Sequence, residues 1–73
     1  MSKTITMQTE FDTVRVRKEY IHCLEECESI FNSSPDSKLE YITYANGDRS
    51  VCVINSEGKL LLKYYMQSNE HRN

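Results

Sequence analysis

The sequence has no tryptophan, one proline and only two glycines among its 73 residues. This excludes collagen-like and low-complexity chains, because both need far more glycine or proline. Hydrophobic residues make up 38% of the chain and charged residues 27%. Such a composition is ordinary for a folded protein and argues against disorder. A chain this short buries only about 60% of the surface that its unfolded form exposes, so its core stabilises it weakly. We expect a single domain over residues 1–73, with a frayed tail over residues 67–73.

The sequence also lacks a long hydrophobic run, and its N-terminus has no apolar stretch of signal-peptide length. Secretion and membrane spanning are therefore not expected. The three cysteines, Cys23, Cys27 and Cys52, are an odd number, which suits free thiols in a reducing compartment. We expect a location in the cytoplasm of a bacterium or of an infected host cell.

An excess of basic residues is missing as well. Nine lysines and arginines face eleven aspartates and glutamates, which gives a formal net charge of −2. Proteins that bind nucleic acid by neutralising phosphates are usually basic. General nucleic-acid binding is thus disfavoured, although the sign of the net charge does not select another partner.

The first half of the chain predicts a short strand over residues 4–8 and a long helix over about residues 10–32. Thr9 begins a Thr-x-x-acid pattern that is typical of a helix N-terminus, so we expect it to be the N-cap. An apolar stripe at helical spacing supports the later turns and consists of Tyr20, Leu24, Cys27 and Phe31. Residues 13–17 alternate like a strand, however. A hairpin of residues 3–8 with 13–18, followed by a shorter helix, therefore stays open as an alternative.

The second half predicts three strands, over residues 39–44, 49–54 and 59–67. A serine, asparagine and proline cluster at residues 32–36 separates them from the helix. Asn46-Gly47 is a strong two-residue hairpin signal, and Gly58 is expected to close a three-residue turn. The predicted fold class is α+β: a small β-α-β-β-β domain in which an antiparallel meander sheet packs against one long helix.

These two turns fix which residues share a sheet face, because register decides the direction of every strand side chain. They pair Ile42 with Val51 and Val53 with Leu61. One predicted face then holds Ile42, Tyr44, Arg49, Val51, Val53, Leu61, Lys63 and Tyr65. The other face is the one that we expect to pack against the helix. It holds Leu39, Tyr41, Thr43, Cys52, Ile54, Leu60, Leu62, Tyr64 and Met66.

One helix covers only one of these two apolar faces. The other face would expose more apolar surface than a soluble monomer usually does, and its charged rim is typical of a protein interface. We therefore predict a partner-binding surface made of Ile42, Tyr44, Arg49, Val51, Leu61, Lys63 and Tyr65. The competing interpretation is that the N-terminal segment folds across this face and completes an ordinary core.

The function that we predict is non-enzymatic protein binding through an open sheet face or edge, with a homodimer as one form of it. The opening segment, a short Ile5-Thr6-Met7 strand that leads into an acidic helix capped by Thr9, resembles the start of many small phage-encoded proteins. This likeness implies an inhibitor or modulator of a host or defence protein. The alternative is binding of single-stranded RNA or DNA, in which Tyr44 and Tyr65 stack on bases while Arg49 and Lys63 contact phosphates.

Catalytic residues, metal ligands and cofactors are not expected. Cys23 and Cys27 are four residues apart on the predicted helix, and Cys52 lies on a strand, but this is not the paired spacing of a zinc site. Three small buried side chains are the simpler interpretation. Neither of the two histidines stands where it could serve a cysteine nucleophile well.

Overall fold

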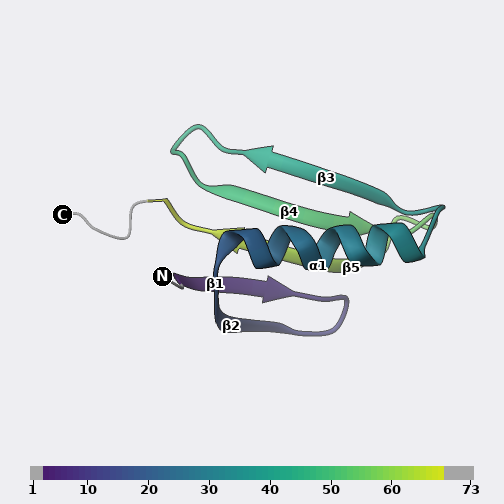
Figure 1. The fold of residues 1–73 in the computed structure, drawn as a ribbon, viewed down its shortest axis with the longest axis horizontal. Coiled ribbons are helices and arrows are strands. Elements are labelled where there is room, and N and C mark those ends of the chain that lie inside the picture. Colours follow the sequence, from purple (N-terminus) through teal and green to yellow (C-terminus); the bar gives the residue numbers. More distant parts are fainter. Residues whose placement is uncertain (1–2, 69–73) are drawn as a thin grey trace.

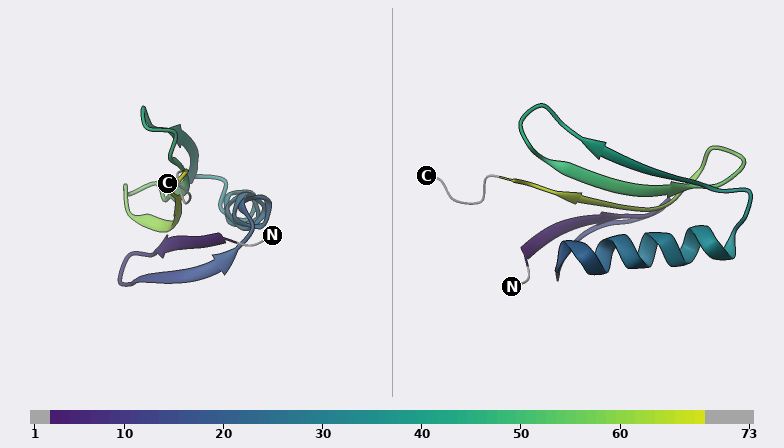
Figure 2. Two further views of the ribbon diagram at one scale, coloured as in Figure 1. Left: turned by 90° about the vertical axis from the view of Figure 1, so that its left-hand side faces the viewer. Right: turned by 45° about the horizontal axis from the view of Figure 1, so that its top comes forward.

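The computed structural model describes residues 3–68. Its elements are β1 (Lys3–Gln8), β2 (Thr13–Lys18), α1 (Tyr20–Ser33), β3 (Lys38–Thr43), β4 (Arg49–Ile54) and β5 (Leu60–Met66). The strands form one antiparallel sheet in the order β2-β1-β5-β4-β3, and α1 lies along one side of it (Figures 1 and 2). The predicted α+β class, with an antiparallel sheet packed against one helix, is confirmed. Most of the predicted frayed tail, residues 69–73, lies outside the described residues.

The predicted long helix is wrong over its first half, and the alternative hairpin is the one that forms. β1 and β2 pair antiparallel over their full length. Thr9 does not cap a helix: its Oγ1 accepts a hydrogen bond from the Asp12 N–H at 3.1 Å, and its own N–H donates to the Asp12 carbonyl at 2.8 Å. The same Thr-x-x-Asp pattern therefore closes a tight turn, because a threonine hydroxyl can accept a nearby N–H in either setting.

Helix α1 begins ten residues later than expected, after the extended residue Glu19. The Glu19 carbonyl accepts the N–H groups of His22 at 3.0 Å and Cys23 at 3.2 Å, which starts the helical ladder. The helix ends where predicted, just before Pro35, because the residue that precedes a proline disfavours helical backbone. The Ser37 hydroxyl donates to the Ser34 carbonyl at 2.6 Å and fixes the turn toward β3.

The hairpin between β3 and β4 turns through three residues, not two. The Tyr44 N–H donates to the Asp48 carbonyl at 2.8 Å and closes the loop. Gly47 within this loop has a φ of 92°, which glycine adopts without strain. Ile42 consequently pairs with Ser50 and not with Val51 as predicted. The extra loop residue moves β4 by one position relative to β3.

The hairpin between β4 and β5 has the predicted three-residue loop, in which the Asn55 N–H donates to the Lys59 carbonyl at 2.9 Å. A β-bulge follows, however, and it shifts the register near the end of β4. Val53 therefore pairs with Leu62, while Leu61 is the residue that the pairing skips.

These two shifts turn β4 over relative to both neighbours, while β3 and the part of β5 after the bulge keep the faces predicted for them. Val51 and Val53 lie under the helix, and Ser50 and Cys52 take their places on the opposite face. The predicted large apolar patch on the uncovered face is thus wrong, because its central valines belong to the core.

The core lies between α1 and the sheet. Its buried members are Ile5, Cys23, Cys27, Val51, Val53, Leu62 and Tyr64. Two of them are cysteines on the helix, and their small side chains allow it to approach the sheet closely. The Cys27 thiol faces the Val51 carbonyl at 3.9 Å. Within residues 3–68, no helix is long and apolar enough to cross a membrane.

Candidate binding surfaces

The seven predicted partner-binding residues fall into two groups. Ile42, Tyr44, Lys63 and Tyr65 share the sheet face that is turned away from α1, as predicted. The other three do not join them there. Val51 is completely buried under the helix, and Leu61 packs against the core at the bulge. Arg49 lies on the helix side, where its guanidinium carbon is 5.7 Å from the centre of the Tyr20 ring.

Two tyrosines meet on the face away from the helix. The ring centres of Tyr44 and Tyr65 are 5.3 Å apart and their planes are tilted by 46°. The Tyr44 hydroxyl lies 3.2 Å from the Ser50 hydroxyl, and the Tyr65 hydroxyl donates to the Asp48 carboxylate. The pair covers Ser50, which has no exposed surface. These aromatic rings are therefore held rigidly on the sheet.

Asp48 is the polar centre of this end of the sheet. The Tyr65 hydroxyl and the Ser68 N–H, at 3.0 Å, both donate to its carboxylate, and these hydrogen bonds lower the pKa of Asp48. The same carboxylate raises the pKa of Tyr65 to about 12. The Ser68 hydroxyl also donates to the Asn46 carbonyl at 3.1 Å. Asp48 thus ties the chain that leaves β5 to the hairpin between β3 and β4.

The face away from α1 also carries basic residues that sequence reasoning missed. Arg15 stands opposite Thr6, which stands opposite Tyr65 in turn, so all three lie in one row across neighbouring strands. Arg17 is two residues from Arg15 on β2 and shares its face, and both arginines are exposed. The signal for them is the Val-Arg-Val-Arg alternation of residues 14–17, which favours the alternative hairpin over the expected long helix.

The outer edge of β3 is the second notable surface. The Tyr44 N–H points to β4, and directions alternate along an antiparallel strand, so Leu39, Tyr41 and Thr43 direct their backbone groups away from β4. No strand of the described chain pairs with this edge. The side chains of Tyr41 and Ile42 are 55% and 37% exposed. The edge thus offers free hydrogen-bonding groups beside apolar surface.

Helix α1 adds a further apolar side chain near this edge. The Tyr41 hydroxyl donates to the Glu28 carboxylate at 3.1 Å, which identifies the side of the helix nearest β3. Ile21 precedes Glu28 by two helical turns, lies on the same side and is 53% exposed. Of the five exposed large hydrophobic side chains in the described chain, three therefore gather on the β3 side of the molecule.

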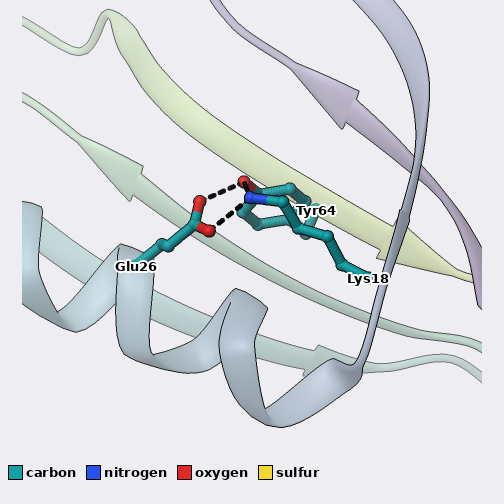
Figure 3. A network of polar contacts seen from close by, with 3 residues as sticks. All are labelled: Lys18, Glu26 and Tyr64. Atoms are coloured by element: carbon teal, nitrogen blue, oxygen red, sulfur yellow. Dashed lines mark hydrogen bonds and ion pairs between the residues drawn. The ribbon is translucent and has the colours of Figure 1, made fainter. Parts of the chain in front are cut away.

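A polar network holds the N-terminal hairpin to the helix (Figure 3). Lys18 donates to the Glu26 carboxylate and, at 3.0 Å, to the Tyr64 hydroxyl, which itself donates to Glu26. The hydrogen bond with Glu26 raises the pKa of Lys18 well above its usual value, and the hydrogen bond with Lys18 lowers that of Glu26. Burial, together with Glu26, raises the pKa of Tyr64. The network joins β2, α1 and β5.

All three cysteines are buried free thiols. Burial raises the pKa of each, that of Cys27 to about 12, so the reactive thiolate is disfavoured. Cys23 and Cys27 face the core, whereas Cys52 lies on the opposite side of the sheet. Residues 3–68 contain no group of three or more histidine, cysteine or acidic side chains placed to hold a metal ion.

Comparisons of this chain with protein-family models, with curated proteins and with solved structures gave no match.

Proposed function

We propose that this chain is a non-enzymatic protein-binding module that uses the edge of β3. The observation that carries the proposal is that Tyr41 and Ile42 are exposed on an unpaired edge strand, while Ile21 is exposed on the side of α1 that is turned toward it. An exposed edge strand is a template for a strand of another chain, since its free N–H and C=O groups can continue the sheet. Main-chain hydrogen bonds would supply affinity, and the three apolar side chains would supply contact area.

The opposite edge makes a useful contrast. β2 is also unpaired on its outer side within the described chain, but it carries Arg15, Arg17 and Lys18. Charged side chains, lysine especially, are a common protection of edge strands against unwanted pairing. β3 has one lysine and one glutamate among its six residues and no net charge, so it is less protected than β2. The proposal therefore concerns β3 and not β2.

The test compares two charge-introducing variants. Tyr41→Lys places a charge on the proposed surface, and Val14→Lys places one at a similarly exposed position of β2, with 55% and 44% exposure respectively. Complex formation is followed by sedimentation of the purified chain alone and by capture from extracts of the source cells. We expect wild type and Val14→Lys to form a complex that Tyr41→Lys loses. Equal behaviour of the two variants, or no complex at all, contradicts the proposal.

A second candidate function is favoured by the row that joins Arg15 to Tyr65. Two arginines, Lys63 and partly exposed tyrosine rings share the sheet face away from α1 with a single exposed glutamate, Glu40, whereas Glu25 and Glu28 lie on the helix. The net charge of −2 thus hides an uneven distribution of charge. Basic and aromatic side chains on one sheet face suit single-stranded nucleic acid.

This candidate is tested by titrating a fluorescently labelled single-stranded oligonucleotide at low and moderate salt. Binding should weaken as salt rises, because phosphate contacts release counterions. The double variant Arg15→Gln and Arg17→Gln should reduce both affinity and salt dependence. Arg49→Gln is the matched control, since Arg49 lies on the helix side and should leave binding unchanged. Binding without salt dependence, or an equal effect of Arg49→Gln, rules the candidate out.

A further inference from the structure

We propose that the occupant of the β3 edge is a second copy of this chain, paired antiparallel through β3 around a two-fold axis at Tyr41. This inference rests on the proposed function and names its partner. It follows from the charges, backbone directions and exposed side chains of β3.

The charges of β3 permit self-pairing. β3 carries Lys38 and Glu40, so two copies of the strand meet without net charge. β2, in contrast, carries three basic residues and no acidic one, and two copies would repel each other. Like charges directly opposed across two strands are destabilising. Of the two edges of the sheet, β3 is therefore the one suited to a symmetric dimer.

Backbone directions select the position of the axis. Leu39, Tyr41 and Thr43 present their N–H and C=O groups outward. An axis at Tyr41 pairs Leu39 with Thr43 of the second copy, and Tyr41 with its own equivalent. All three outward residues of both copies are then used, which gives about six hydrogen bonds, because each such pair exchanges two.

Neighbouring positions of the axis are less favourable. An axis at Glu40 opposes two glutamates directly, with their Cα atoms only about 4.5 Å apart. An axis at Ile42 leaves Leu39 without a partner in the other β3. An axis at Leu39 requires the N–H of Ser37, which already donates to the Ser34 carbonyl at 2.9 Å. The register centred on Tyr41 is thus the one that loses no hydrogen bond and opposes no like charges.

Side-chain placement agrees with this register. Tyr41 meets its equivalent on the helix side of the sheet, and Ile42 lies opposite Glu40 on the other side, where it contacts the aliphatic part of that side chain. Ile21 faces the same edge from α1. An axis perpendicular to the sheet leaves both helices on one side and both uncovered faces on the other. The dimer is then one continuous sheet that spans both copies.

The first test of this dimer removes a backbone donor. Thr43→Pro deletes one outward N–H while the ladder with β4 stays intact, because proline is tolerated where an edge strand faces solvent. Thr43→Val keeps the N–H and is the matched control. We expect wild type and Thr43→Val to sediment as dimers and Thr43→Pro to dimerise at least about tenfold more weakly. A wild-type monomer at concentrations up to about 1 mM overturns the proposal.

A second test keeps the proposal falsifiable if the proline variant misfolds. Tyr41→Cys places two cysteines about 5.5 Å apart across the axis, which is within the Cα separation that a disulfide needs. Under mild oxidation this variant should form a covalent dimer, while Val14→Cys, on the other edge strand, should not. The native thiols are buried and give little background. Equal cross-linking of both variants contradicts the register.

Failure of the dimer can be distinguished from failure of the proposed function. A wild-type chain that stays monomeric, yet captures another protein in a manner that Thr43→Pro abolishes, refutes self-pairing and retains β3 as a docking edge. A monomeric chain with no partner that depends on β3 refutes both.

Discussion

Val51 provides the sharpest test of the register on which both surfaces depend. In the structure its side chain has no exposed area and lies in the core beneath α1, whereas the sequence pattern placed it on a partner-binding face. Val51→Thr replaces one methyl group with a hydroxyl of similar size. A hydroxyl buried without a hydrogen-bond partner costs about 1–3 kcal/mol in proteins. For a domain of this size, each kcal/mol lowers the melting temperature by about 4–8 °C.

The matched control is Val14→Thr. Val14 lies on the same face of the sheet but is 44% exposed, so its hydroxyl keeps contact with water. Urea unfolding followed by circular dichroism should show a clear drop in the midpoint for Val51→Thr and a change within about 0.5 kcal/mol for Val14→Thr. Similar midpoints for the two variants would mean that β4 does not present Val51 to the helix, and the register would be refuted.

Three further predictions concern the polar network, the thiols and Asp48. Lys18→Met should lower the free energy of unfolding by about 0.2–1 kcal/mol, because its ion pair with Glu26 is partly exposed and screened. Urea unfolding measures this loss, and an unchanged midpoint would contradict the prediction. Cys27 should resist a thiol reagent at neutral pH until urea unfolds the chain, and rapid labelling of the native protein would contradict its burial. The pKa of Asp48 is lowered by folding, so its stabilising effect is complete above its unfolded pKa of about 4 and is lost as the pH falls through the folded pKa. Asp48→Asn should therefore be less stable than wild type at pH 7 and closer to wild type near pH 3, and an equal difference in stability at both pH values would refute this pH dependence. The same variant should move the pKa of Tyr65 from about 12 back toward 10 in an absorbance titration.

The adjacency of the two tyrosines could be predicted from the sequence although the register was not. Tyr44 directly follows β3 and Tyr65 lies on β5, and the two one-residue shifts cancel between these strands. Only β4, between them, is turned over. Alternation along each strand is visible in a sequence, but an extra loop residue or a bulge moves a whole strand by one position. That is why Val51 was misplaced while Tyr65 was not.

The N-terminal hairpin shows a different limit of sequence reasoning. The alternation of Val14 and Val16 with arginines indicated a strand, and Thr9 with Asp12 indicated a helix start. Each signal comes from residues close together in the sequence, whereas the contact that decides between strand and helix joins distant parts of the chain. β1 pairs with β5, where Met7 stands opposite Tyr64, far along the chain. A pairing over such a separation leaves no pattern in the short segment that it stabilises.

The register of β4 decides where the exposed apolar surface of the sheet lies. With Val51 under the helix, the uncovered face loses its central apolar residue and is no longer a large apolar patch. Exposed apolar surface is instead concentrated beside β3, whereas β2 presents arginines. Within residues 3–68, no further helix or strand covers the outer edge of β3. Because β2 carries three basic side chains and β3 only one lysine and one glutamate, we expect an added strand at β3, where it would bury the exposed Tyr41 and Ile42 and satisfy the free backbone groups in one step.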